Sequence, residues 1–162
     1  MAFGALGPAA ELASESFGRV TAEEALAAGV HIVLGPVADV NSDPRNPIIA
    51  TRAFSTDTRA AARLAAAYVR GCQKTGAAAM AKHFPGHGNT IEDSHAALPM
   101  VEGDRATLME RDVAPFRAAI DAGVRCIMTA HVAYPALDPD GVPATVSKPI
   151  LTDLLRLSLI HI

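Results

Sequence analysis

The sequence contains no tryptophan, and aromatic residues make up only 4% of its 162 residues. Proteins that bind single-stranded nucleic acids stack the bases on aromatic side chains, so this scarcity argues against that class of protein. The 14 Lys and Arg residues are scattered along the chain, and the formal net charge is −3. Because a nucleic-acid backbone calls for clustered positive charge, we expect no nucleic-acid partner.

Long apolar runs and closely spaced cysteines are also missing. No apolar run reaches the roughly 18 residues of a membrane-spanning helix, and the N-terminus lacks the basic and apolar regions of a signal peptide. We therefore expect no membrane partner and a cytoplasmic protein. Cys72 and Cys126 lie far apart, which favours reduced core residues over a disulfide framework or a metal site. Neither a G-x-G-x-x-G nor a Walker A motif occurs, and we expect no cofactor.

Apolar residues, by contrast, are abundant: hydrophobic residues make up 50% of the chain, enough for one core of ordinary size. Composition and spacing predict helices at residues 8–29, 57–71 and 104–123, and a further helix that opens at residues 147–149. Short apolar runs predict strands at residues 30–34, 77–81 and 124–128. Helices that alternate with strands require parallel pairing with crossover connections, so the predicted fold class is α/β.

Polar residues follow each predicted strand. The carboxyl ends of parallel strands meet at one edge of a sheet, where a (β/α) barrel or an open doubly wound sheet binds its ligand. The residues at these positions are Asp39 and Asn41, then Lys82 and His83, then Thr129 and His131. The sequence therefore predicts a ligand site at this edge, with His131 as one candidate for its pocket.

The richest stretch covers residues 82–99, KHFPGHGNTIEDSHAALP. Asp93 lies two residues before His95, and in a loop this spacing lets the carboxylate accept a hydrogen bond from one ring nitrogen. The bond would fix the tautomer and raise the imidazole pKa, which suits proton transfer near neutral pH. In the alternative interpretation, Asp93 and Ser94 merely cap the next segment and the histidines are surface residues.

Taken whole, this stretch resembles the N-terminal barrel domain of glycoside hydrolase family 3, in its β-N-acetylhexosaminidase branch. The matching motifs are K-H-F-P-G-H-G, D-S-H and L-P, and the one departure is Asn89, where that branch usually has Asp. Residues 35–55, GPVADVNSDPRNPIIATRAFS, also resemble a segment of this family. The resemblance implies a partial (β/α)8 TIM-type barrel of about three to four βα units over residues 1–156, with residues 157–162 as a tail that does not match.

The resemblance also implies roles for individual residues. His95 would be the general acid and Asp93 would orient it, while Arg52, Lys82 and His83 would bind hydroxyls of a small-molecule saccharide. The family retains anomeric configuration through an aspartate nucleophile. We expect that aspartate beyond Ile162, and therefore expect hydrolysis of terminal β-linked N-acetylglucosamine from peptidoglycan- or chitin-derived saccharides by the parent protein and no turnover by this chain.

Other interpretations remain open at this point. A histidine acid could tolerate phosphate as the acceptor, which would make the parent a phosphorylase. A metal-dependent hydrolase would use as ligands His83, His87, Asp93, His95 and His131, and the chain could also be a sugar-binding remnant without catalysis. Arg52 could instead be a solvated loop charge or an ion-pair partner of Asp39 or Asp43. His31, within a predicted strand, is expected in the core.

Overall fold

The computed structural model describes residues 3–91 and 98–160. Its centre is a parallel sheet whose strands are β1 (Ile32–Val33), β2 (Ala78–Phe84) and β3 (Cys126–Thr129), in that order across the sheet. Ile32 pairs with Ala78, and Met80 pairs with Cys126. The parallel pairing and the helices between the strands confirm the predicted α/β class.

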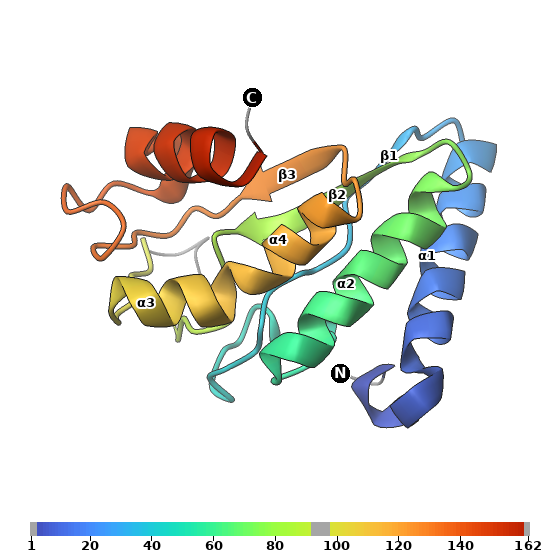
Figure 1. Cartoon of the computed structure of the whole chain (residues 1–162), viewed down its shortest axis with the longest axis horizontal. Coiled ribbons are helices and arrows are strands. Elements are labelled where there is room, and N and C mark those ends of the chain that lie inside the picture. Colours follow the sequence, from blue (N-terminus) through green and yellow to red (C-terminus); the bar gives the residue numbers. More distant parts are fainter. Residues whose placement is uncertain (1–2, 92–97, 161–162) are drawn as a thin grey trace.

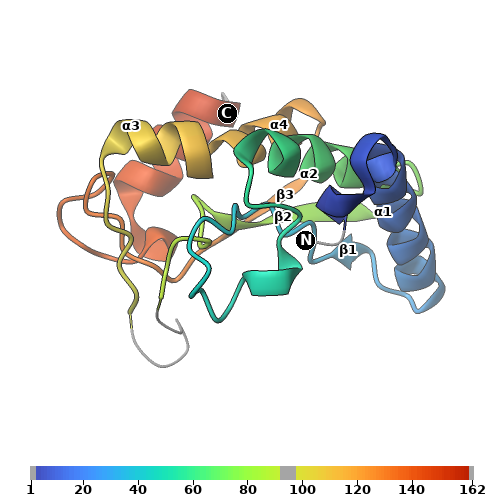
Figure 2. The ribbon, with the colours of Figure 1, turned by 90° about the horizontal axis from the view of Figure 1, so that it is seen from below.

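Helices cover one side of this sheet. A 3-10 helix (Phe3–Ala9) leads into α1 (Ala10–Ala27), which packs against α2 (Thr58–Gln73). Helix α2 in turn packs against α4 (Ala114–Asp121), and the chain ends in a π-helix (Pro149–Ile160). Figure 1 shows these helices in front of and beside the strands, and Figure 2 shows that the loop after β1 lies on the opposite side of the sheet.

Helix α2 illustrates how the sequence sets an element. The carboxylate of Asp57 accepts a hydrogen bond from the Ala60 backbone N–H at 2.8 Å, which satisfies a donor that the first helical turn leaves unpaired. Leu64 and Tyr68, four residues apart, are both buried, as expected for the apolar face of an amphipathic helix. The helix therefore begins at a capping carboxylate and is held by an inward apolar face.

Strand β2 is longer than the sequence predicted, because its pairing continues past the apolar run. Lys82 pairs with Met128, and Phe84 pairs with Thr129 after a register shift. On the other flank the Lys82 N–H donates to the Pro36 carbonyl at 3.0 Å, and the Ala38 N–H donates to the Lys82 carbonyl at 2.7 Å. Lys82 and His83 therefore lie inside the end of β2, not beyond it.

The helix predicted over residues 104–123 is interrupted. It begins as α3 (Arg105–Thr107), widens into a π-helical turn (Leu108–Asp112) and resumes as α4. Pro115, in the first turn of α4, has no N–H to donate, so a regular helix could not continue its hydrogen bonding through this position. The wider turn is closed instead by the Val113 N–H, which donates to the Leu108 carbonyl at 3.0 Å.

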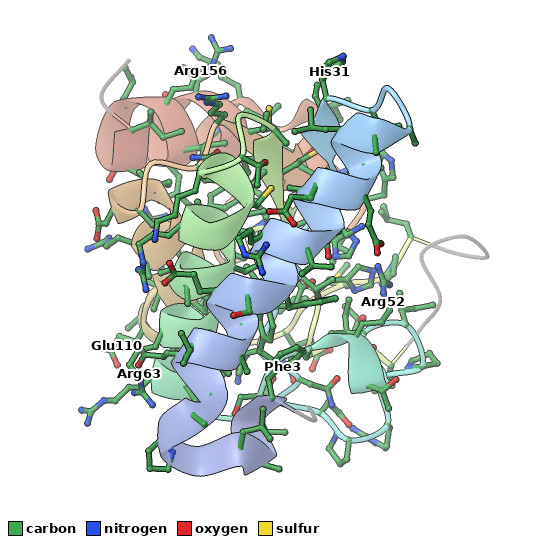
Figure 3. The ribbon with its side chains drawn as sticks, turned by 90° about the vertical axis from the view of Figure 1, so that its right-hand side faces the viewer. Phe3, His31, Arg52, Arg63, Glu110 and Arg156 are labelled. Carbon is green, nitrogen blue, oxygen red and sulfur yellow. The ribbon has the colours of Figure 1, made fainter. Side chains whose placement is uncertain are left out.

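The expectation that His31 lies in the core is wrong. His31 precedes β1 and is exposed, and Figure 3 shows it at the outer edge of the molecule. In the described sheet β1 is an edge strand with β2 on one side only, and Ile32 and Leu34 are 46% and 56% exposed. Both cysteines are free, and Cys72 is buried. None of the helices in the described ranges combines the length and apolarity required to cross a membrane.

Candidate active site

The candidate site is built around the turn that follows β2. Gly86 adopts a φ of 137°, a conformation that glycine accepts at little cost. Gly88 lies so close to the loop after β1 that an added Cβ would be 1.8 Å from the Val40 carbonyl oxygen. The Asp43 N–H donates to the Gly88 carbonyl at 3.2 Å, so the two segments are also hydrogen-bonded. Glycines in the K-H-F-P-G-H-G motif thus allow the turn to pack directly on the loop after β1.

Asp39 connects that loop to the turn. Its carboxylate is fully buried and accepts hydrogen bonds from the His87 N–H at 2.7 Å and from the His83 N–H at 3.1 and 3.2 Å. The Nδ1 atom of His83 is 2.7 Å from Oδ2 of the same carboxylate. Residues 36–38 pair with β2 through their backbone and so continue the parallel alignment up to Ala38. Asp39 comes next in the chain and is therefore held beside the end of β2.

His87 is held deeper in the same turn. Its Nδ1 atom is 2.7 Å from the hydroxyl of Thr90, and the Asn46 side-chain amide donates to the His87 carbonyl at 2.8 Å. Burial lowers the pKa of His87, the Asp39 carboxylate partly offsets this, and nearby His83 and Arg52 add to the lowering. A buried, neutral His87 therefore braces the turn.

Two further buried side chains, Tyr134 and Asp112, lie against Gly86. The Tyr134 hydroxyl, on the segment after β3, donates to the Gly86 carbonyl at 2.7 Å. Asp112 lies against Gly86, where an added Cβ would be 2.6 Å from the Asp112 Cβ, and its carboxylate bonds the Arg111 guanidinium at 2.8 Å. Burial raises the pKa of Asp112, and the Arg111 ion pair partly offsets this.

Lys82 and Arg52 meet in one cavity. This cavity has a volume of about 410 Å³, and its other side chains include Phe3, Phe54 and Tyr68. Burial lowers the pKa of Lys82, and the nearby Arg52 guanidinium lowers it further, while Asp39 raises it. Figure 3 shows Phe3 and Arg52 on the same side of the molecule. Two cations beside aromatic and apolar walls form a cavity suited to a small polar ligand with an apolar face.

Arg52 reaches this cavity from a short 3-10 helix (Ala50–Arg52) in the loop after β1. The side chain is exposed, and its Nη1 atom donates to the Ile48 carbonyl at 3.1 Å. The two carboxylates considered as ion-pair partners bind other residues: Asp43 pairs with Arg45 at 2.7 Å and Asp39 contacts His83. The Arg45 hydrogen bonds lower the pKa of Asp43 to about 2.

The remaining predicted residues lie elsewhere. His131 follows β3, is exposed, and has its Nδ1 atom 2.9 Å from the Thr145 hydroxyl. It is not among the residues that line the Lys82–Arg52 cavity, and neither is His83, whose side chain is 16% exposed. Asp93 and His95 lie outside the described residues, so their expected acid/base roles stay predictions.

Asn89, the departure from the family motif, lines a different cavity. This second cavity has a volume of about 370 Å³, and Asp43, Arg45 and Glu102 are among its other lining residues. Asn89 thus lies beside three charged side chains without adding a charge of its own.

The metal alternative receives no support from the described part of the chain. Residues 3–91 and 98–160 contain no group of three or more His, Cys, Asp or Glu side chains that could hold a metal ion. His83 and His87 are close, with ring centroids 5.8 Å apart, but their Nδ1 atoms contact Asp39 and Thr90.

Sequence reasoning missed the buried partners of the turn. Asp39 was recognised as a polar residue after a strand and as a possible ion-pair partner of Arg52, and Tyr134 and Asp112 were not singled out. Each contacts the turn from more than 20 positions away in the chain, so no local spacing reveals the contact. The one available signal was the polar loop directly after the first strand.

This fold and this site define an α/β protein whose polar side chains gather at the carboxyl ends of parallel strands, as they do in (β/α) barrels. A model of the glycosyl hydrolase family 3 N terminal domain matches residues 1–159. The chain therefore belongs to glycosyl hydrolase family 3, as the motifs indicated.

Solved structures and curated relatives agree with this assignment. A glycoside hydrolase family 3 β-N-acetylglucosaminidase from Paenibacillus sp. str. FPU-7 is similar over 98% of this chain and 30% of its own, with a TM-score of 0.94 and 43% identity. NagZ from Neisseria gonorrhoeae, in complex with N-trifluoroacetyl-D-glucosamine, is similar over 91% of this chain and 42% of its own (TM-score 0.83, 40% identity).

Among curated relatives, β-hexosaminidase A from Pseudoalteromonas piscicida is 42% identical over 79% of this chain. The chain spans only 23% of the length of that relative.

Proposed function

We propose that the protein from which this chain comes hydrolyses terminal β-linked N-acetylglucosamine from saccharides with retention of configuration. The observation that carries the proposal is the cavity shared by Lys82 and Arg52 at the end of β2, next to a His83 ring held by Asp39. The β-N-acetylglucosaminidase similarity and the glucosamine derivative bound by the Neisseria relative support this choice of sugar.

The chemistry of the cavity suits a sugar ring. Lys82 and Arg52 offer charged donors to hydroxyl oxygens, and such hydrogen bonds are roughly twice as strong as neutral ones. Apolar walls from Phe3 and Phe54 suit the less polar face of a pyranose. These groups hold the ring in place for a double displacement, in which His95 protonates the leaving oxygen and then activates water.

The experiment uses this chain extended to the length of its curated relatives. We expect it to release p-nitrophenol from the p-nitrophenyl glycoside of N-acetyl-β-glucosamine, while the 162-residue chain does not. Lys82→Met should lower kcat/KM about 10- to 100-fold, because a charged hydrogen bond contributes about 1.5 to 3 kcal/mol. The matched control is Lys148→Met, at an exposed lysine before the C-terminal helix.

Three results would contradict the proposal: an inactive extended chain, equal effects of the two lysine substitutions, or full activity of His95→Ala on a substrate with a sugar leaving group. The identity of the product separates the two possible acceptors. Release of N-acetylglucosamine supports hydrolysis, whereas release of its 1-phosphate in phosphate buffer would make the protein a phosphorylase.

A further inference from the structure

The buried carboxylate of Asp39 contacts the ring of His83 and is placed to fix the orientation of that ring. We propose that Asp39 is the positioning residue for His83: its carboxylate fixes the ring with the proton on Nδ1, so that Nε2 is the nitrogen presented to the sugar. The inference rests on the proposed function, because it assumes that His83 binds the saccharide.

The hydrogen bonds of the Asp39 carboxylate fix where the ring proton of His83 lies. Three donors converge on one carboxylate: the His83 N–H, the His87 N–H and His83 Nδ1, at distances from 2.7 to 3.2 Å. An ionised carboxylate can only accept hydrogen bonds, so the Nδ1 atom that contacts it carries the proton. In the neutral ring Nε2 is then an acceptor, which suits a hydroxyl donor of a sugar.

The burial of the Asp39 carboxylate carries an energetic cost. Burying a carboxylate is unfavourable unless hydrogen bonds and charge compensate it. Asp39 is 0% exposed, and hydrogen bonds from the His83 N–H, the His87 N–H and the His83 ring offset its burial, so the ring proton has to lie on Nδ1. The other loop and helix carboxylates of the site pair with arginines, as Asp43 does with Arg45 and Asp112 with Arg111.

Asp39 also holds the backbone around the His83 ring. Asp39 bonds the N–H groups of both His83 and His87, so the same carboxylate fixes the His83 ring and the main chain on either side of the Pro85–Gly86 turn. In Asp39→Asn a carboxamide N–H would replace one of the carboxylate oxygens. The His83 ring would then accept a hydrogen bond from this N–H at Nδ1. The proton would then move to Nε2, and the ring nitrogen that faces the sugar would become a donor.

The test compares Asp39→Asn with Asp112→Asn in the extended protein. Both residues are buried aspartates that pack on the same turn, and of the two only Asp39 is hydrogen-bonded to the His83 ring in the described structure. The primary measurement is the ¹⁵N chemical shifts of the histidine rings, with His83→Gln identifying the His83 signals, at a pH where the ring is neutral.

We expect a neutral His83 with its proton on Nδ1 in the wild-type protein and in Asp112→Asn, and a shift toward the Nε2-protonated form in Asp39→Asn. The kcat/KM for the glycoside should fall about 100-fold in Asp39→Asn, because a misplaced binding group costs about that much. A purely structural role would give the two variants the same ring signals.

Each outcome decides the matter. A wild-type spectrum with the proton on Nε2 alone would overturn the inference even if Asp39→Asn does not fold. Unchanged ring signals and kcat/KM in a folded Asp39→Asn protein would overturn it as well. An extended protein that is inactive on the glycoside, yet shows the Nδ1-protonated ring, would contradict the proposed function and leave the Asp39–His83 pairing standing.

Discussion

The carboxyl ends of β2 and β3 each carry a histidine, but the two histidines are held in different ways. His83, at the end of β2, contacts a fully buried carboxylate and is followed by a turn that His87 and Tyr134 brace. His131, after β3, is exposed and contacts a neutral hydroxyl. The comparison indicates that β2 provides the preorganised part of the candidate site, because among the described residues buried polar groups fix the histidine of β2 and not that of β3.

The largest expected effect comes from Gly88→Ala. The new Cβ would lie 1.8 Å from the Val40 carbonyl oxygen, a backbone atom that cannot move without displacing the loop that carries Asp39. We expect a loss of about 3 kcal/mol or more in the free energy of unfolding, measured by urea denaturation.

The control for Gly88→Ala is Gly141→Ala, in the loop after β3. No atom of the described residues lies within 4 Å of a Cβ added there, and its φ of +66° should cost about 1 kcal/mol. Equal losses in the two variants would contradict the close packing of the turn.

The next effect is expected from Tyr134→Phe. This change removes a fully buried hydroxyl and leaves the Gly86 carbonyl without that donor, at a cost of about 1 to 3 kcal/mol in the free energy of unfolding. Thr145→Val removes the hydroxyl that contacts His131 at the partly buried end of β3, and we expect a loss below about 1 kcal/mol. A larger loss for Thr145→Val would reverse the comparison.

Substitution of the two histidines compares the strand ends in function. In the extended protein, His83→Ala should lower kcat/KM for the N-acetylglucosaminide about 10- to 100-fold. The variant loses the hydrogen bond between the sugar and the His83 ring, which the charged Asp39 carboxylate holds in place. His131→Ala should lower it less than about threefold, because in the described part of the chain its exposed ring has no buried partner that would keep it in one orientation for the sugar. Comparable losses would show that β3 contributes as much to binding as β2.

The smallest effect concerns pH. Burial lowers the pKa of His87, so between its folded value and the unfolded value near 6.5 the unfolded state binds more protons. Stability should therefore fall as the pH drops through about 6.5 toward the folded pKa. His87→Asn, which does not titrate, should lose less over this interval in urea denaturation. The raised pKa of Asp112 acts in the opposite direction but equally in both proteins, and identical slopes would contradict a neutral, buried His87.

The sequence predicted the alternation of strands and helices, and it placed Lys82 and His83 at the ligand edge. These features have local signals in the sequence, namely apolar runs and helical periodicity. The start of α2 is local in the same sense, because Asp57 caps the helix that directly follows it. The exposure of His31 was not predictable in this way, because it depends on which strands flank β1 in the described sheet. The break at the π-helical turn had a local signal, Pro115, but the helical pattern on either side obscured it.

The Asp39–His83 contact could not be predicted from spacing. The two residues are 44 positions apart and meet because residues 36–38 continue the parallel pairing with β2. Register of this kind depends on the assembled sheet. The family motifs predicted which residues bind sugar, whereas the contact of one of them, His83, with the Asp39 carboxylate became visible only in the folded structure.

The most direct test of the account is a crystal structure of the extended protein with N-acetylglucosamine bound. We predict hydrogen bonds to the sugar from Lys82, Arg52 and the Nε2 atom of His83, with Nδ1 of His83 still on Asp39. A sugar bound against His131, with the His83 ring turned away or unengaged, would contradict the claim that the end of β2 forms the preorganised part of the site.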